Sequence, residues 1–307
     1  MGTPEFAVGS LRKLRNENFN IVGVITSPDK PSGRGRKIKS SPVKQYALQQ
    51  GLKIFQPEKL KDPGFIHEIT SLKPDLQVVV AFRMLPEEVW KLPRFGTINL
   101  HASLLPQYRG AAPINWAIIN GETETGVTTF FINEKIDTGK IIFQEKVPIQ
   151  QDETAGELHD KLMQTGANLL VQTVSAIMFD TCSQIDQSTL IENNIPLKPA
   201  PKIHSEDCRI NWNLGVEDIY NLIRGLSPDP GSWSELDINQ GETLFLKIYK
   251  SDKEMVKPSH PPGTIVSDNK KYVKVAAKDG YIILQNIQQA GKKRMDIEDF
   301  LRGIKIR

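Results

Sequence analysis

Hydrophobic residues along the first two-thirds of the chain alternate between two kinds of pattern. Residues 20–26, 76–81 and 97–101 are short runs with the aliphatic content or the alternation typical of strands. The stretches between them have helical spacing, and several begin with a proline, which is favoured in the first helical turn: Pro42, Pro86 and Pro113. This order predicts an α/β fold with a doubly wound, mostly parallel sheet, whose ligands bind beyond the carboxyl ends of the strands.

The pattern continues with two further strands, over residues 127–132 and 140–147, and a long helix. Thr154 and Glu157 have the spacing of a capping box, which predicts the start of this helix. Its apolar residues fall largely on one side: Leu158, Leu162, Leu169, Leu170, Val174 and Ile177. The helix is therefore expected to cover one face of the sheet.

The last third of the chain has a different organisation. Residues 183–204 lose the periodicity and gain three prolines, which predicts a linker. A short helix near 216–224 and several short β patterns follow, over residues 244–249, 264–266, 272–276 and 281–284. Many short strands indicate a small OB-like β-barrel, a fold often used to bind nucleic acid. We therefore expect an α/β domain over 1–182, a linker over 183–204 and an OB-like domain over 205–307.

Composition restricts the class of protein further. With 307 residues, 39% hydrophobic and 24% charged, the chain is typical of a globular protein of two domains. No apolar run approaches the ~20 residues of a membrane span, and no signal-peptide pattern is present, so we expect a cytoplasmic protein that does not bind membranes. Cys182 and Cys208 lack metal-site spacing and the five histidines are scattered, so we expect no metal.

Positive charge is concentrated in two segments. The chain carries a net charge of +3, but residues 27–44 alone carry +5 and residues 243–294 carry +7, so the remainder is acidic. Charge runs are often only solvated surface. Two such runs beside an acidic body are better suited to a polyanionic partner such as nucleic acid.

The candidate chemistry lies on the strand over 97–101. Asn99 and His101 alternate with apolar neighbours, so they share one face of the strand, roughly 6.5–7 Å apart. An amide and an imidazole so placed can hold an oxyanion and handle a proton. Asp137, if the fold brings it near, would orient the imidazole. The pattern therefore indicates an acyl-transfer site without a nucleophile, although Asn99 and His101 could also be polar residues of a solvated face, and Asp137 a turn cap.

Longer motifs give these residues a context. The segment Ile98–Gly110, with the Ser-Leu-Leu-Pro run of residues 103–106, resembles the signature of the 10-formyltetrahydrofolate-dependent formyltransferases, which have a Rossmann-like fold. The resemblance extends over nearly the whole chain, through the segments Gly2–Val8, Pro28–Arg36, Ser41–Lys44, Gly121–Thr128 and Leu226–Gly231. It implies transfer of a formyl group from 10-formyltetrahydrofolate, a co-substrate, to the α-amino group of methionine esterified to initiator tRNA, for translation initiation.

The resemblance also implies roles for individual residues. Asn99 and His101 would stabilise the oxyanion and Asp137 would support the imidazolium. Two loops would line the folate pocket, with Ser103, Leu104, Leu105 and Pro106 from one and Phe82 and Leu85 from the other. The basic loop that would enter the acceptor end of tRNA holds Arg34, Arg36 and Lys37. We expect a monomer.

The sequence departs from the family pattern at two places. Ala81-Phe82-Arg83 stands where many relatives have Ala-Tyr-Gly, and the strand that precedes Gly2-Thr3-Pro4 in the family is absent. Two other functions stay open. A formyltransferase for a small amine, such as glycinamide ribonucleotide or an amino sugar, would not need the basic loop, and a non-catalytic tRNA-binding relative would not need Asn99, His101 and Asp137.

Overall fold

The computed structural model describes residues 1–32, 37–191, 195–238, 241 and 243–306, with the side chains of Ser32 and Lys37 left out. The chain forms two compact units. The first comprises Met1–Gly110, Glu124–Pro148 and His159–Ala200, and the second comprises Ala111–Thr123, Ile149–Leu158 and Pro201–Arg307. No described helix is both long enough and apolar enough to cross a membrane.

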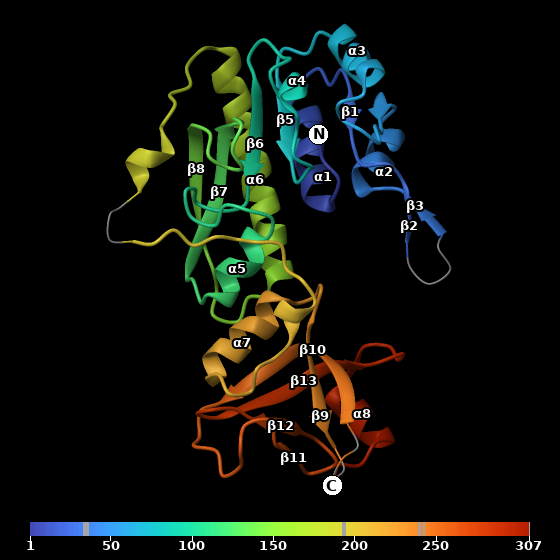
Figure 1. The fold of residues 1–307 in the computed structure, drawn as a ribbon, viewed down its shortest axis with the longest axis vertical. Helices are drawn as coiled ribbons and strands as arrows, with labels where there is room; N and C mark the ends of the chain where they lie inside the picture. The colour runs from blue at the N-terminus through green and yellow to red at the C-terminus, as the bar shows by residue number, and fades with distance from the viewer. Residues whose placement is uncertain (33–36, 192–194, 239–240, 242, 307) are drawn as a thin grey trace. The chain divides into compact units, whose positions relative to one another are not determined.

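A four-stranded sheet forms the centre of the first unit (Figure 1). Its order is β5 (Gln77–Val80), β6 (Thr97–His101), β7 (Glu124–Phe131) and β8 (Ile141–Pro148). β5 and β6 run parallel, whereas β7 and β8 add antiparallel strands. The expected strands are therefore present, and the sheet is mixed because β7 and β8 are joined by a short connection that reverses the chain.

A second, smaller parallel pair lies in the same unit, formed by β1 (Val24–Ile25) and β4 (Ile54–Phe55). The strand expected over residues 20–26 is reduced to β1, because residues 20–23 line a cavity instead of pairing. β2 (Lys30–Ser32) and β3 (Lys37–Lys39) form a hairpin that the sequence did not predict.

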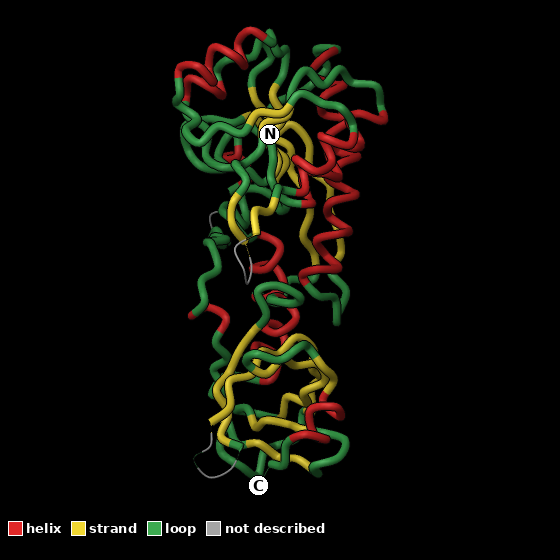
Figure 2. Tube along the Cα trace, turned by 90° about the vertical axis from the view of Figure 1, so that its right-hand side faces the viewer, coloured by secondary structure: helices red, strands yellow, loops and turns green. Residues whose placement is uncertain are grey.

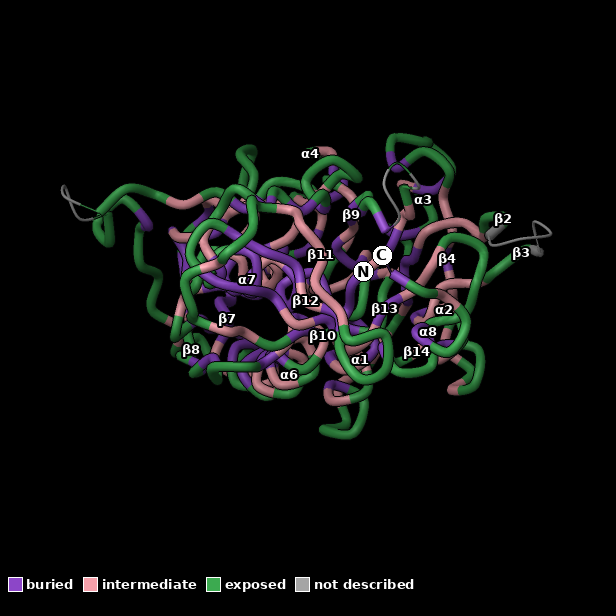
Figure 3. The backbone as a smooth tube through the Cα atoms, turned by 90° about the horizontal axis from the view of Figure 1, so that it is seen from below, coloured by how far each residue is buried: buried purple, intermediate pink, exposed green. Residues whose placement is uncertain are grey.

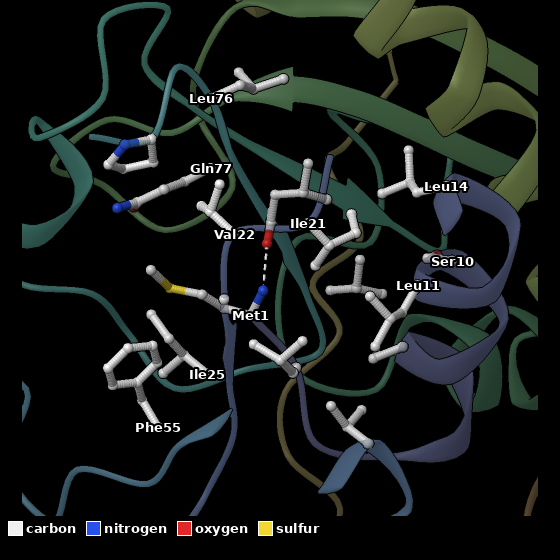
Figure 4. Close-up of a pocket in the computed structure, with 18 of the residues that line it drawn as sticks. Met1, Ser10, Leu11, Leu14, Ile21, Val22, Ile25, Phe55, Leu76 and Gln77 are labelled. Atoms are coloured by element: carbon white, nitrogen blue, oxygen red, sulfur yellow. Dashed lines mark hydrogen bonds between the residues drawn. The ribbon is translucent and has the colours of Figure 1, made fainter. Parts of the chain in front are cut away.

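The first two residues lie between β1 and β5. The Met1 amine donates a hydrogen bond to the Val78 carbonyl at 2.6 Å, and the Gly2 N–H donates to the Ile25 carbonyl at 3.0 Å. Beyond Met1 the two strands face an aliphatic cavity of about 150 Å³ (Figure 4). Four backbone groups on its walls have no partner among the described residues: the carbonyls of Gly23 and Leu76 and the N–H groups of Ile25 and Val78.

Helices of the first unit begin with ordinary capping residues. α2 (Pro42–Gln49) and α3 (Pro63–Ser71) have proline at the first turn and side-chain caps, and α1 (Glu5–Asn16) and α4 (Glu87–Trp90) directly follow a proline. The long α6 (Ala155–Met178) starts at the predicted capping box, where Thr154 and Glu157 bind each other's backbone N–H. Its Thr173 hydroxyl lies 2.8 Å from that of Thr129 on β7.

The second unit contains a curled antiparallel sheet, whose strands are yellow near the C-terminus in Figure 2. In it β9 (Ser232–Asp237), β10 (Thr243–Glu254) and β13 (Tyr281–Gln289) are neighbours. β12 (Val273–Ala276) and β11 (Ile265–Ser267) continue it, and β14 (Met295–Asp296) pairs with β13. The helices of this unit are α5 (Pro113–Ile119), α7 (Val216–Gly225) and α8 (Ile297–Gly303), with a short 3₁₀ turn η2 (Glu206–Cys208).

Aliphatic side chains fill the centre of this sheet. Ile219 and Ile223 of α7 pack in one cluster with strand residues such as Ile248, Val275 and Ile282, all fully or almost fully buried. Figure 3 colours the backbone by burial, and much of α7 is in the purple of buried residues. The curled sheet closed by a helix is the OB-like fold class that the sequence predicts. β9, β14 and α8 were not predicted.

Candidate active site

The site is built on the end of β6. β6 lies between β5 and β7, with Asn99 opposite Val79 and Phe130, and His101 opposite Thr128. The alternation along the strand places Asn99 and His101 on one face, as expected. Asn99 is half-buried, and its Oδ1 has no hydrogen-bond partner among the described residues. A buried acceptor without a partner is unfavourable, so this oxygen is suited to receive a donor from a bound molecule.

Both ring nitrogens of His101 face acceptors. Nε2 lies 2.8 Å from the Tyr108 carbonyl, and Nδ1 lies 3.8 Å from Oδ2 of Asp137. Because a carbonyl can only accept, Nε2 carries a hydrogen and donates it to Tyr108. A second proton on Nδ1 would face the Asp137 carboxylate, so this arrangement provides a place to hold a proton.

Asp137 reaches this position from the connection between β7 and β8. Its Oδ2 accepts a hydrogen bond of 2.9 Å from the Gly110 N–H, which is 27 residues away in the chain. The carboxylate thus reaches another loop and does not cap its own turn. The backbone of Asp137 has φ of +52°, in the left-handed region that residues other than glycine seldom adopt.

The loop after β6 is held firmly against the sheet. The Ser103 hydroxyl donates to the Gln107 carbonyl at 2.7 Å, and the Thr128 hydroxyl donates to the Ser103 carbonyl at 2.6 Å. The Leu105 side chain is buried with Phe130 and Ile141, Pro106 is buried and Leu104 is half-buried. Leu105 therefore packs in the core, and its assignment to the folate pocket stays a prediction.

The loop after β5 leaves the same edge of the sheet, because β5 and β6 run parallel and Val80 lies opposite Leu100. Leu85 is buried in a hydrophobic cluster with Phe82 packed against it. Arg83 donates to the carbonyls of Pro57 and Glu58 at 2.7 and 3.0 Å. The residue that departs from the family pattern is thus bound to the loop after β4.

The basic segment is described only in part. Arg34 and Arg36, and the side chain of Lys37, lie outside the described residues. Lys44 forms an ion pair with Asp29 at 2.6 Å, and its hydrogen bond lowers the pKa of that carboxyl. The acidic residue of the segment is therefore already neutralised by Lys44.

One part of the site was missed from the sequence. The stretch predicted as a linker contributes a short 3₁₀ helix, η1 (Gln187–Leu190), and Gln187 is buried against the Asp137 turn. The Ala200 N–H donates to the Arg109 carbonyl at 2.8 Å. Gly110 has φ of +130°, and a Cβ there would lie 2.3 Å from the Ala200 carbonyl oxygen, so the close approach requires glycine. A glutamine in a Pro-rich stretch gives no signal of such contacts.

The fold and the site residues define a known class of protein. Residues 1–174 match the formyl transferase family, and residues 202–305 match the formyl transferase C-terminal domain. The chain belongs to this family, as the sequence predicted.

Particular relatives extend the comparison over the full length. The chain is 55% identical over 306 residues to methionyl-tRNA formyltransferase of Bacteroides thetaiotaomicron, covering 100% of this chain and 95% of the relative. It is 56% identical over 304 residues to the methionyl-tRNA formyltransferase of Phocaeicola vulgatus, covering 99% and 94%.

Solved structures show the same fold. The sugar 3N-formyl transferase WlaRD, in the presence of dTDP and 5-N-formyl-THF, has a TM-score of 0.65 at 22% identity, covering 95% of this chain and 97% of that one. HypX from Aquifex aeolicus, in complex with tetrahydrofolic acid, has a TM-score of 0.59 at 18% identity, covering 85% and 45%.

Proposed function

We propose that the protein transfers a formyl group from 10-formyltetrahydrofolate to the α-amino group of methionyl-initiator tRNA, for translation initiation. The observation that carries the proposal is the cluster of Asn99, His101 and Asp137 at the end of β6, with a free amide oxygen and a paired imidazole and carboxylate. Full-length relatives that are methionyl-tRNA formyltransferases support this acceptor. The enzyme would act in the cytoplasm, as a monomer and without a metal.

The chemistry needs an oxyanion site and a route for one proton. The amine nitrogen attacks the formyl carbon, the bond from that carbon to the folate nitrogen breaks, and the proton lost by the amine is delivered to the folate nitrogen. The tetrahedral intermediate carries an oxyanion, whose stabilisation is usually the largest catalytic effect. The amide of Asn99 donates to this oxygen through Nδ2, while Oδ1 accepts from the attacking amine.

His101 acts as the charged partner. Its Nδ1 faces Asp137, which holds the imidazolium and, through a water molecule, helps to take up the proton of the amine. In the structure Nε2 donates to the Tyr108 carbonyl. Direct donation to the oxyanion therefore requires Nε2 to exchange this carbonyl for the substrate oxygen.

The folate would lie between the two loops that leave the same edge of the sheet. Ser103, Leu104, Leu105 and Pro106 would form one wall and Phe82 and Leu85 the other. The rigid hydrogen bonding of the first loop supports this assignment, because a fixed loop can present its backbone groups to a ligand without further ordering.

The ester of an aminoacyl group withdraws electrons and lowers the pKa of its amine, so a substantial neutral fraction exists near pH 7 and no strong base is required. The two segments with net charges of +5 and +7 would contact the phosphates of the tRNA. We assign Arg34, Arg36 and Lys37 to the first of these contacts.

The deciding experiment measures formylation of methionyl-initiator tRNA with 10-formyltetrahydrofolate. Uncharged tRNA is the control for the amine, and glycinamide ribonucleotide and a dTDP-amino sugar are the competing acceptors. We expect formyl transfer only to the charged tRNA. The alternative acceptor is a small amine, which the full-length relatives named methionyl-tRNA formyltransferase do not favour. Turnover of either small amine with none on charged tRNA would replace the proposal with that acceptor.

A further inference from the structure

Gln187 is a buried polar residue in the stretch that the sequence predicts to be a linker. It is 2% exposed and begins η1. Its amide makes four hydrogen bonds. Nε2 donates to the carbonyls of Asp137 and Gly139 at 2.9 and 2.8 Å, and Oε1 accepts from Nε and Nη2 of Arg109 at 3.1 and 2.6 Å. The Gln187 amide nitrogen thus binds the loop of Asp137 and Gly139, and its amide oxygen binds Arg109 in the loop after β6.

These contacts form a ring of hydrogen bonds next to the His101 side chain. Gln187 joins Arg109 to the backbone of Asp137, and the Asp137 carboxylate returns to the Gly110 N–H next to Arg109. The residue before Arg109 is Tyr108, whose carbonyl receives the His101 Nε2 hydrogen bond. The two acceptors that face the imidazole therefore belong to loops that Gln187 holds together.

The Asp137 turn needs such support from outside. A left-handed backbone at a residue other than glycine persists only where its surroundings hold it there. The donors of Gln187 bind the carbonyls on both sides of Thr138, at the point where this conformation occurs. A fully satisfied buried amide is rigid, because losing either partner leaves a buried polar group unpaired.

We propose that Gln187 is a positioning residue, which fixes the Asp137 turn against the loop of Tyr108 and Gly110 and so sets the geometry of the Asp137–His101 pair. This inference rests on the proposed function for its catalytic consequence. The charged groups near the ring are Asp137, Arg109, Asp186 and Lys140. Asp186, the N-cap of η1, is hydrogen-bonded to Ser188 and attracted by Lys140. Gln187 itself touches no reacting atom.

Two variants separate positioning from folding. Gln187→Leu removes all four hydrogen bonds, whereas Gln187→Glu keeps an acceptor for Arg109 and removes only the donors to the Asp137 turn. Thr189→Ala is the matched control, because Thr189 lies in the same 3₁₀ helix, is exposed, and among the described residues its hydroxyl donates only to the carbonyl of the N-cap residue Asp186. Asp137→Asn serves as the comparison for loss of the carboxylate.

We expect both Gln187 variants to lower kcat by 10- to 100-fold, with KM for the formyl donor within about threefold of the parent, because small misplacements of reacting groups are costly. Their pH–rate profiles should be displaced as in Asp137→Asn. Hydrogen exchange of the Gly110 amide, which Asp137 holds, should be faster in both, whereas Thr189→Ala should match the parent in every measurement.

Unchanged kcat and profile in both variants would overturn the proposal. So would a lower kcat with an unchanged profile and an unchanged Gly110 exchange rate, because that is the result of a structural role only. The exchange measurement needs no substrate. If the parent protein fails to formylate any acceptor but the variants still speed up Gly110 exchange, the proposed function fails and the positioning role stands.

Discussion

At the scale of single residues, the arrangement of His101 explains how a site without a nucleophile can act. Its Nε2 hydrogen is held by the Tyr108 carbonyl, and its Nδ1 faces Asp137. Asn99, on the same face of β6, has an oxygen without a partner. The two side chains are therefore suited to different roles. Asn99 can hydrogen-bond to the reacting groups, and His101 can carry a positive charge beside the Asp137 carboxylate. If the proposed function holds, we expect their effect to be greatest in the transition state.

We therefore expect Asn99→Ala and His101→Ala each to lower kcat by on the order of 10²–10³, with nearly unchanged affinity for the folate. Steady-state formylation and a separate folate-binding titration check the two parts. His67→Ala is the control, because His67 is an exposed histidine of α3. Near-normal turnover of either variant would remove that residue from the mechanism.

At the scale of elements, the helices and strands that could be predicted are those with a clear pattern in the nearby sequence. The strand over 97–101 and the start of α6 were predicted to the residue, because alternation and a capping box are local signals. The contact of His101 with Asp137 could be expected only from the family resemblance. The role of Gln187 could not be predicted, since its partners lie 48 to 78 residues away in the chain.

Short elements were missed for a related reason. The hairpin of β2 and β3 and the two-residue β14 are too short for a periodic pattern. β1 is shorter than its aliphatic run, because in the described part of the chain the residues before it pair with no strand. The hydrophobic pattern of a segment predicts whether it can form a strand, whereas hydrogen bonding to a neighbouring strand decides how long that strand is.

The Met1 amine provides a prediction about stability. Burial lowers the pKa of this amine from 8.0 to about 5. Between these values the unfolded chain binds a proton that the folded chain does not, so this group lowers stability as pH falls from 8 toward 5. The full effect is about 4 kcal/mol in the free energy of unfolding, at 1.36 kcal/mol per pKa unit. Urea unfolding at pH 8.5, 7 and 5.5 measures it.

Acetylation of the amine is the control for this titration, because the acetylated chain has no charge to bury. The difference in stability between the free and acetylated chains should grow as pH falls through this range. An equal difference at pH 8.5 and 5.5 would contradict the assigned pKa of the amine.

At the scale of the whole molecule, charge separates the possible acceptors. The segments 27–44 and 243–294 hold more net positive charge than the chain as a whole. A small amine needs no such surface, whereas a tRNA presents a row of phosphates. The binding of the acceptor should therefore depend strongly on salt if it is a tRNA, and weakly if it is a small amine.

Replacing Arg34, Arg36 and Lys37 together with alanine should weaken tRNA binding and flatten its salt dependence. Each lost phosphate contact reduces the slope of log K against log salt by about 0.7–0.9. Activity on a small amine surrogate should change much less. The matched control replaces Lys59, Lys61 and Lys73, which are exposed cations outside both segments. Equal affinity and slope in the first variant and the parent would leave the loop as solvated surface.

The place of Met1 between two strands has a practical consequence for producing the protein. Met1 lines the aliphatic cavity and its amine is bonded to the Val78 carbonyl, so a residue fused ahead of Met1 replaces that amine with an amide beside the cavity. A polyhistidine tag joined there would bring polar side chains next to this aliphatic lining. The position of a purification tag therefore affects the packing around Met1, and preparations should be compared only when they have the same amino-terminal residues.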